Sequence, residues 1–254
     1  MALVTGASSG IGAAFARRLA ANGSDLVVVA RRRDRLEELA AELMTAHGVH
    51  VEALAADLTD PAQLALVEAR LGDPDRPVDL LVNNAGAGGH GAFAALPIDD
   101  VEAMIRLNLL APVRLTSAAL AAMVARGSGG IVNVSSISGE QPIPFVATYA
   151  ATKAFLTSLS ESVHDEVRDK GVSVTAVLPG FTRSEFHDRA DMGRDIPKPF
   201  WIPADEVAKA ALAAVARGQA ICVPRFSYRV LVGLARHAPR GLVRRVAGMV
   251  GRRT

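Results

Sequence analysis

The sequence predicts an α/β fold: a single domain built on a doubly wound parallel sheet of about seven strands, with helices on both faces. Short apolar runs alternate with longer helical patterns along most of the 254-residue chain, which is typical of strands joined by crossover helices. The apolar runs lack a strict apolar–polar alternation, as expected of strands covered on both faces. Half of the residues are hydrophobic and 21% are charged, which favours a compact domain over disorder.

The elements follow one another in a regular order. The apolar runs predict strands over residues 2–4, 26–30, 49–55, 80–82, 131–134, 172–178 and 220–223. Helical patterns between them predict helices over residues 11–22, 34–47, 61–71, 99–126, 148–170 and 204–217. The irregular, proline-containing segment 181–203 follows the sixth strand, where an open α/β sheet presents its ligand crevice, and we expect it to form a substrate lid. We divide the chain into a catalytic domain, 1–224, and a C-terminal extension, 225–254.

A glycine-spaced turn joins the first strand to the first helix. Gly6, Gly10 and Gly12 would let a pyrophosphate approach the backbone without a Cβ in the way. The helix that follows would offer N–H groups and the positive end of its dipole. The spacing differs from the general G-x-G-x-x-G fingerprint, so alone it could be an ordinary strand–helix turn. In a Rossmann-like fold of this order, it predicts a dinucleotide site. The turn residues expected to bind the cofactor are Gly6, Ser8, Ser9, Gly10, Ile11 and Gly12.

The end of the second strand indicates which dinucleotide is preferred. NAD-binding sites usually place an acid there, on the ribose 2′-hydroxyl, but this chain has Ala30 followed by residues 31–33, all arginine. An arginine would accept a 2′-phosphate through charge-assisted bonds. We therefore predict NADP(H) over NAD(H), with Arg31 as the contact; the alternative is a solvated, basic start to the next helix. Asp57 and Leu58, after the third strand, are expected at the adenine.

Tyr149, Lys153 and Ser136 form the predicted chemical site. Tyr149 and Lys153 are four residues apart and share one helix face. An ordinary tyrosine has a pKa of about 10, and a nearby ammonium would lower it and make the phenol a usable general acid or base. Ser136 follows the strand 131–134 and lies thirteen residues before Tyr149. The alternative is a surface tyrosine beside a surface lysine, a common chance pair, but the glycine turn and Ser136 favour catalysis.

The chain resembles the short-chain dehydrogenase/reductase family over roughly residues 2–224. The resemblance rests on motifs in family order: the T-G-x₃-G-x-G turn, the segment Asn83-Asn84-Ala85-Gly86, Asn108, Ser136, the Tyr149/Lys153 pair and Pro179-Gly180. It implies a catalytic tetrad of Asn108, Ser136, Tyr149 and Lys153. Tyr149 would protonate a carbonyl oxygen that Ser136 orients. Lys153 would bind the nicotinamide ribose and lower the pKa of the tyrosine, and Asn108 would hold a proton-relaying water.

The resemblance also implies further cofactor contacts and an assembly. The additional cofactor residues would be Asn84, Ala85, Gly86, Pro179, Gly180 and Thr182. Ser184 stands where a threonine is more usual. A homodimer or homotetramer is implied, because helices corresponding to 99–126 and 148–170 commonly form the contacts in this family.

The predicted function is that of an NADP(H)-dependent carbonyl reductase, reversible as an alcohol dehydrogenase. Aromatic residues flank the expected cleft or lid and would make it suit a lipophilic or acyl-linked ketone or aldehyde; the alternative is that they pack in the core. They are Phe145, Phe181, Phe186, Phe200 and Trp201. His90 lies in a glycine-rich loop that could reach the substrate or have no role. A non-catalytic dinucleotide-binding regulator or scaffold is the alternative from another class. A third is a lipid-surface protein whose tail is its main function.

The charge is unevenly placed. Residues 225–254 hold eight arginines and no acid, although the net charge is only +2. From residue 240 on, apolar and arginine residues fall on opposite sides of a helical wheel, which is typical of helices that lie on anionic membranes. The tail could instead contact an acidic carrier, or pack on its own body. Nucleic acid is not expected, because no aromatic platform or reader motif accompanies the charge.

The sequence predicts no metal site, transmembrane helix or signal peptide, and it predicts one buried thiol. The six histidines are scattered without metal-ligand spacing, so no metal is predicted. Cys222, in an apolar run, is the single cysteine; it predicts a buried thiol and a cytoplasmic location. No apolar run is long enough to predict a transmembrane helix, and the start of the chain lacks the pattern of a signal peptide.

Overall fold

The computed structural model describes residues 1–183, 185, 200–237 and 241. In these residues, seven parallel strands form one sheet in the order β3-β2-β1-β4-β5-β6-β7. The strands are β1 (Ala2–Thr5), β2 (Leu26–Ala30), β3 (Val51–Ala55), β4 (Leu80–Asn83), β5 (Gly129–Val134), β6 (Val172–Val177) and β7 (Ile221–Cys222). The doubly wound α/β prediction is confirmed. The strand order reverses between β1 and β4, which is the switch point where such sheets bind ligands.

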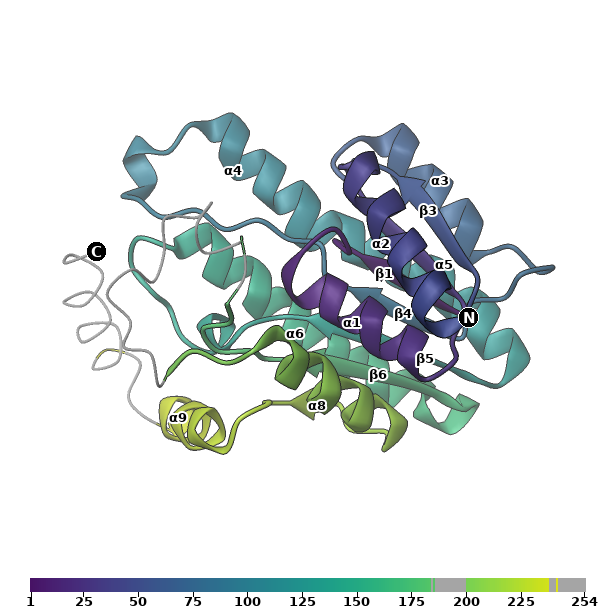
Figure 1. The fold of residues 1–254 in the computed structure, drawn as a ribbon. Coiled ribbons are helices and arrows are strands. Elements are labelled where there is room, and N and C mark those ends of the chain that lie inside the picture. Colours follow the sequence, from purple (N-terminus) through teal and green to yellow (C-terminus); the bar gives the residue numbers. More distant parts are fainter. Residues whose placement is uncertain (184, 186–199, 238–240, 242–254) are drawn as a thin grey trace.

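Helices cover both faces of the sheet (Figure 1). They are α1 (Gly10–Ala21), α2 (Arg33–His47), α3 (Pro61–Leu71), α4 (Ile98–Ile105), α5 (Ala111–Arg126), α6 (Ala147–Val167), α8 (Ala204–Ala216) and α9 (Phe226–His237). Short turns of helix are η1 (Phe93–Ala95), η2 (Arg106–Leu110), η3 (Ile137–Glu140) and η4 (Arg168–Lys170).

Two apolar clusters form the core, one on each face of the sheet. Ala2 and Val4 of β1 point into the cluster shared with α1, α2 and α8. Leu3, between them, points into the cluster shared with α3 and α5. Successive side chains of a strand alternate between faces, and both faces here are buried. This explains why the strands read as continuous apolar runs.

The long helix predicted over 99–126 is divided in two. The π-helical turn η2 separates α4 from α5, and Pro112 lies at the start of α5. Proline has no N–H to donate to the preceding turn, and π-turns within helices often occur at functional sites. The sequence pattern missed the break because its apolar periodicity runs through it.

The run 98–126 is long and apolar enough to cross a membrane by length and composition alone, since an 18-residue stretch within it has a mean hydropathy of 1.5. Leu115, Ala119 and Met123 of α5 nevertheless pack in the core cluster on the sheet. We therefore interpret the run as a core helix pair, since core helices meet the same criterion.

The folded body continues beyond residue 224, where the sequence suggested a boundary. Tyr228 and Val232 of α9 are buried in the larger core cluster, and α9 packs against η3. The predicted amphipathic helix from residue 240 on lies outside the described residues, apart from Gly241.

Candidate active site and cofactor cleft

The glycine turn is packed tightly against the end of β4. A Cβ on Gly6 would lie 2.8 Å from Asn84 Nδ2, and one on Gly12 would lie 2.3 Å from the Gly6 carbonyl oxygen. Asn84 Nδ2 donates to the carbonyls of Thr5 (3.0 Å) and Gly6 (3.3 Å). Gly6 and Gly12 are therefore required by the turn's own packing, a role that the sequence analysis did not assign to them. Gly10 has a φ of 56°, in the left-handed region that favours glycine.

The start of α1 suits an anion. Ser9, its N-cap residue, makes no side-chain capping bond, and the first turn contains no acid. The N–H groups of that turn are directed out of the helix beside the positive end of its dipole. These residues fit the pyrophosphate of a dinucleotide at the switch point between β1 and β4.

Arg32, rather than Arg31, reaches the glycine turn. Arg32 Nη2 donates to Ser8 Oγ at 3.1 Å, and Arg32 Nη1 lies 3.1 Å from Glu185 Oε2. Arg31 is exposed. Glu185 also accepts from Arg35 Nη1 at 2.7 Å. The run of arginines was the available signal in the sequence, but it did not indicate that Arg32 turns toward Ser8, and nothing in the sequence pointed to Arg35 or Glu185.

Asp57 and Leu58 lie directly after β3, as predicted. Asp57 Oδ1 accepts from the Thr59 N–H (2.9 Å) and hydroxyl (2.8 Å), so the carboxylate stabilises the turn that it stands in. Leu58 is buried among the residues that pack on α3. The structure places both at the carboxyl edge of the sheet, and contact with an adenine stays a prediction.

The four residues of the expected tetrad come from three parts of the fold. Ser136 follows β5 and caps η3, Tyr149 and Lys153 lie on α6, and Asn108 lies in η2. Each is at least nine-tenths buried. The Ser136 hydroxyl hydrogen-bonds the Tyr149 phenol, and Lys153 Nζ lies 5.7 Å from the centre of the Tyr149 ring.

Reciprocal bonds fix Lys153 to the end of β5. Lys153 Nζ donates to the Val134 carbonyl at 2.8 Å, and Ser135 Oγ donates to the Lys153 carbonyl at 2.7 Å. A Cβ on Gly139 would lie 2.7 Å from the Ala154 nitrogen, so η3 lies directly on α6. The serine-bearing strand and the tyrosine-bearing helix therefore hold one geometry.

Asn108 holds the loop after β4. Its Oδ1 accepts from the Ala87 N–H, and its Nδ2 donates to the Ala87 carbonyl, both at 2.8 Å. Nδ2 also lies 3.3 Å from Thr152 Oγ1, on the same helix as Tyr149. A Cβ on Gly86 would lie 3.2 Å from Asn108 Oδ1 and 3.6 Å from Lys153 Nζ. The structure thus gives Asn108 an anchoring role, and the water role stays a prediction.

Burial sets the acidity of the two central groups. It raises the pKa of Tyr149 to about 12, although the hydrogen bond with Ser136 lowers that pKa in part. Burial also lowers the pKa of Lys153 to about 8. The pKa of Tyr149 therefore lies above its usual value rather than below it, because desolvation of the phenolate outweighs the hydrogen bond with Ser136. A lowering of that pKa by Lys153 stays a prediction. A neutral phenol at neutral pH is the form that can donate a proton.

The segment after β6 is anchored by α9. Thr182, 2% exposed, donates from Oγ1 to the Gly180 carbonyl at 3.0 Å. A Cβ on Gly180 would lie 2.1 Å from Cζ of Tyr228. Ser184 and most of the predicted lid, including Phe186, lie outside the described residues.

Comparison with known proteins agrees with this geometry. Residues 1–194 match the family model described as short chain dehydrogenase. The chain belongs to the short-chain dehydrogenase/reductase family of oxidoreductases.

Three relatives illustrate the range within the family. Human very-long-chain 3-oxoacyl-CoA reductase is 32% identical over 202 residues, which cover 78% of this chain but only 64% of that protein. A short-chain dehydrogenase from Sphingobium yanoikuyae in complex with NADPH is 42% identical, with a TM-score of 0.85, over 91% of this chain and 92% of that one. The bulky-bulky ketone specific alcohol dehydrogenase from Comamonas testosteroni is 37% identical, with a TM-score of 0.81, over 95% and 92% of the chains.

Aromatic side chains lie in the loops that lead to this dehydrogenase site. His90 and Phe145 have ring centres 5.9 Å apart, and Phe181 and Trp201 have ring centres 5.8 Å apart. Phe145 has a φ of 69°, a strained conformation for a bulky residue, and its carbonyl accepts from the Gly91 N–H at 2.8 Å. Backbone strain of this kind concentrates at functional sites.

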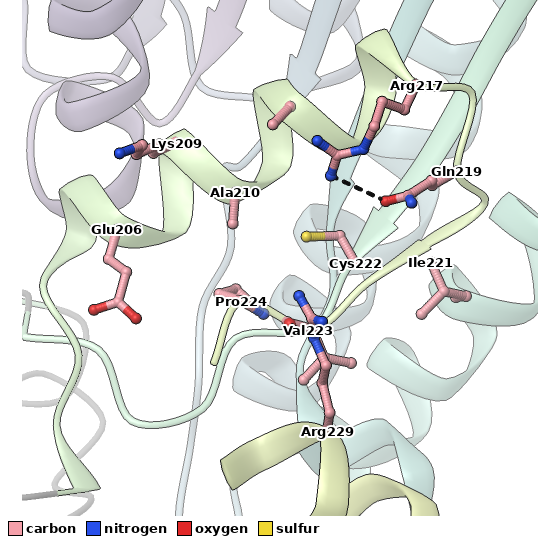
Figure 2. A pocket seen from close by; sticks show the side chains of 11 residues that line it. Glu206, Lys209, Ala210, Arg217, Gln219, Ile221, Cys222, Val223, Pro224 and Arg229 are labelled. Atoms are coloured by element: carbon pink, nitrogen blue, oxygen red, sulfur yellow. Dashed lines mark hydrogen bonds between the residues drawn. The ribbon is translucent and has the colours of Figure 1, made fainter. Parts of the chain in front are cut away.

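A cavity of about 710 Å³ lies elsewhere on the dehydrogenase, between α8, β7 and the start of α9 (Figure 2). Lys209, Arg217 and Arg229 are among its lining residues, and no member of the tetrad is. Cys222 also lines it; burial raises the pKa of this thiol, which disfavours the reactive thiolate form. The cavity is therefore separate from the tetrad and the glycine turn.

Proposed function

We propose that the protein is an NADP(H)-dependent oxidoreductase that interconverts a ketone or aldehyde and the corresponding alcohol. The observation that carries the proposal is the buried contact of Ser136 with Tyr149, beside Lys153. A dinucleotide-binding regulator would need the glycine turn, but it would have no use for a buried phenol aligned with a serine.

In the proposed reduction, Ser136 positions the carbonyl, and Tyr149 with Lys153 transfers the proton. The bound dinucleotide would supply a hydride to the carbonyl carbon. The Ser136 hydroxyl donates a hydrogen bond to the carbonyl oxygen, and Tyr149 gives that oxygen its phenolic proton, so that the carbonyl becomes an alcohol. The Lys153 ammonium stabilises the phenolate left on Tyr149 by charge attraction until a solvent proton replaces the one given.

A preference for NADP(H) is supported by charge. Arg32 donates to Ser8 of the glycine turn, and Arg35 shares the Glu185 carboxylate with Arg32. Guanidinium groups suit phosphate oxygens. The Sphingobium relative was solved with NADPH. Arg32 replaces Arg31 as the contact that we favour.

A bulky, lipophilic carbonyl is the substrate that the aromatic side chains of the surrounding loops favour most. The pairs His90–Phe145 and Phe181–Trp201 offer aromatic surface near the site, and such surface favours large apolar ligands. The names of the Comamonas and human relatives refer to a bulky ketone and to a 3-oxoacyl-CoA. A homodimer or homotetramer is part of the same proposal.

The experiment is NADPH consumption, followed by absorbance, against a panel of carbonyls: 3-oxoacyl thioesters, steroid ketones, aromatic aldehydes and small diketones. NADH serves as the second cofactor. Turnover with NADPH on one class would support the proposal and identify that class. Tight NADPH binding without turnover on any class would favour the regulator instead.

A further inference from the structure

Glu185 lies between two arginines, one of which contacts the glycine turn. Its Oε2 is 3.1 Å from Arg32 Nη1, and its Oε1 is 2.7 Å from Arg35 Nη1. Arg32 also donates to Ser8 of the glycine turn. One carboxylate therefore joins the segment after Gly180 to the start of α2 and, through Arg32, to the glycine turn.

The same two guanidinium groups could also donate to a phosphate. Arginine binds carboxylate and phosphate oxygens with the same planar array of N–H groups. Arg32 lies two residues after the end of β2, where this type of fold holds the adenosine ribose. A 2′-phosphate on that ribose would need the N–H groups that now donate to Glu185.

The contact can be exchanged for another anion. The side chains of Arg32, Arg35 and Glu185 are 29%, 46% and 35% exposed, and ion pairs with this much solvent access contribute little net stability. The two arginines hold the pKa of the Glu185 carboxyl below its usual value, so it is charged at neutral pH. A charged competitor is thus present whenever NADP(H) binds.

We infer that the Glu185 carboxylate competes with the 2′-phosphate of NADP(H) for Arg32 and Arg35, and so weakens the preference for NADP(H) over NAD(H). The inference rests on the proposed function. It makes Glu185 a specificity-determining residue that opposes the two arginines, since NAD(H) has no 2′-phosphate and can bind while Glu185 keeps both contacts.

The test is the dissociation constant of NADPH and of NADH, measured by fluorescence for the wild type and Glu185→Gln. The expected result is NADPH binding that is tighter by about five-fold, the scale of two exposed ion pairs, with NADH binding changed less than about two-fold. Glu37→Gln is the matched control: it removes an equal charge from α2, where Glu37 pairs with Arg33 at 3.7 Å. It should leave the NADPH/NADH ratio unchanged.

A double variant tests whether Glu185 acts through the two arginines. In Arg35→Gln, the gain from Glu185→Gln should shrink, because the carboxylate then opposes one arginine fewer. Equal changes for both cofactors, or weaker NADPH binding in Glu185→Gln, would overturn the inference while leaving the proposed function intact. A wild type that binds neither dinucleotide would overturn both.

Discussion

The ring of Tyr228 fills the space that a side chain at Gly180 would need. The Tyr228 hydroxyl also accepts from the Phe181 N–H (3.3 Å) and donates to the Phe200 carbonyl (2.5 Å). Helix α9 therefore joins the two ends of the segment that follows β6, close to η3 and Ser136.

Gly180→Ala should destabilise the protein. The added Cβ would lie 2.1 Å from the Tyr228 ring, and overpacking of a tight core site costs about 1–3 kcal/mol. The free energy of unfolding, from chemical denaturation, checks this. Gly233→Ala in α9 is the control: its Cβ would meet nothing within 4 Å, and it should be neutral or slightly stabilising. Equal stability for the two variants would contradict the contact.

Two truncated chains should separate the contribution of α9 from that of the residues that follow it. A chain ending at 237 keeps Tyr228 and should fold and turn over as the full chain does. A chain ending at 224 loses the Tyr228 bridge and should lose activity and stability. Thermal unfolding and NADPH consumption of the three chains check this.

Membrane binding by the C-terminal residues can be tested with the same chains. The arginines that follow residue 237 predict binding of the full chain to anionic vesicles, with salt abolishing it, because exposed charges are screened. The chain ending at 237 should bind less in a co-sedimentation assay. α9 also exposes Phe226, Val230, Leu231 and Leu234, so residual binding by the shorter chain would assign the contact to α9. Equal sedimentation of both would contradict the tail's role.

Lys153 should make stability depend on pH. Its folded-state pKa, about 8, is below the ordinary 10.5, so folding disfavours the ammonium. This cost is fully present below pH 8 and disappears as the pH rises toward 10.5. The free energy of unfolding of the wild type, relative to Lys153→Met, should therefore rise over this range by up to ~3 kcal/mol. The hydrogen bond from Lys153 to the Val134 carbonyl does not affect this pH dependence, because Lys153→Met lacks it at every pH. A pH-independent difference would contradict the buried ammonium.

The two directions of the reaction should respond differently to pH. Reduction needs the neutral Tyr149 phenol, which its pKa of about 12 preserves at neutral pH. Alcohol oxidation needs the phenolate, so its rate should increase with pH between 7 and 9 while reduction does not. Ser136→Ala removes a bond that lowers this pKa, so it should move the oxidation profile to higher pH. Parallel profiles in both directions would exclude Tyr149 as the proton donor.

The sheet and the Tyr149/Lys153 pair were predictable from local pattern, whereas Asn108 was implied only by the family resemblance. Apolar runs mark strands buried on both faces, and Tyr149 and Lys153 meet through the helix repeat alone. The rest depends on contacts between distant residues. The choice of Arg32 over Arg31 depends on Ser8 and Glu185, and the need for Gly6 depends on Asn84. The anchoring role of Asn108 depends on its bonds to Ala87, and the high pKa of Tyr149 depends on burial. None of these leaves a periodic signal.

The most direct test of the central claim is NADPH consumption by Tyr149→Phe with the best carbonyl of the panel. The variant keeps the ring and loses the proton, so turnover should fall by at least about 10²-fold, the scale of general acid catalysis, while the dissociation constant of NADPH stays near that of the wild type. Full turnover by Tyr149→Phe would contradict the account, because the proton would then come from another group.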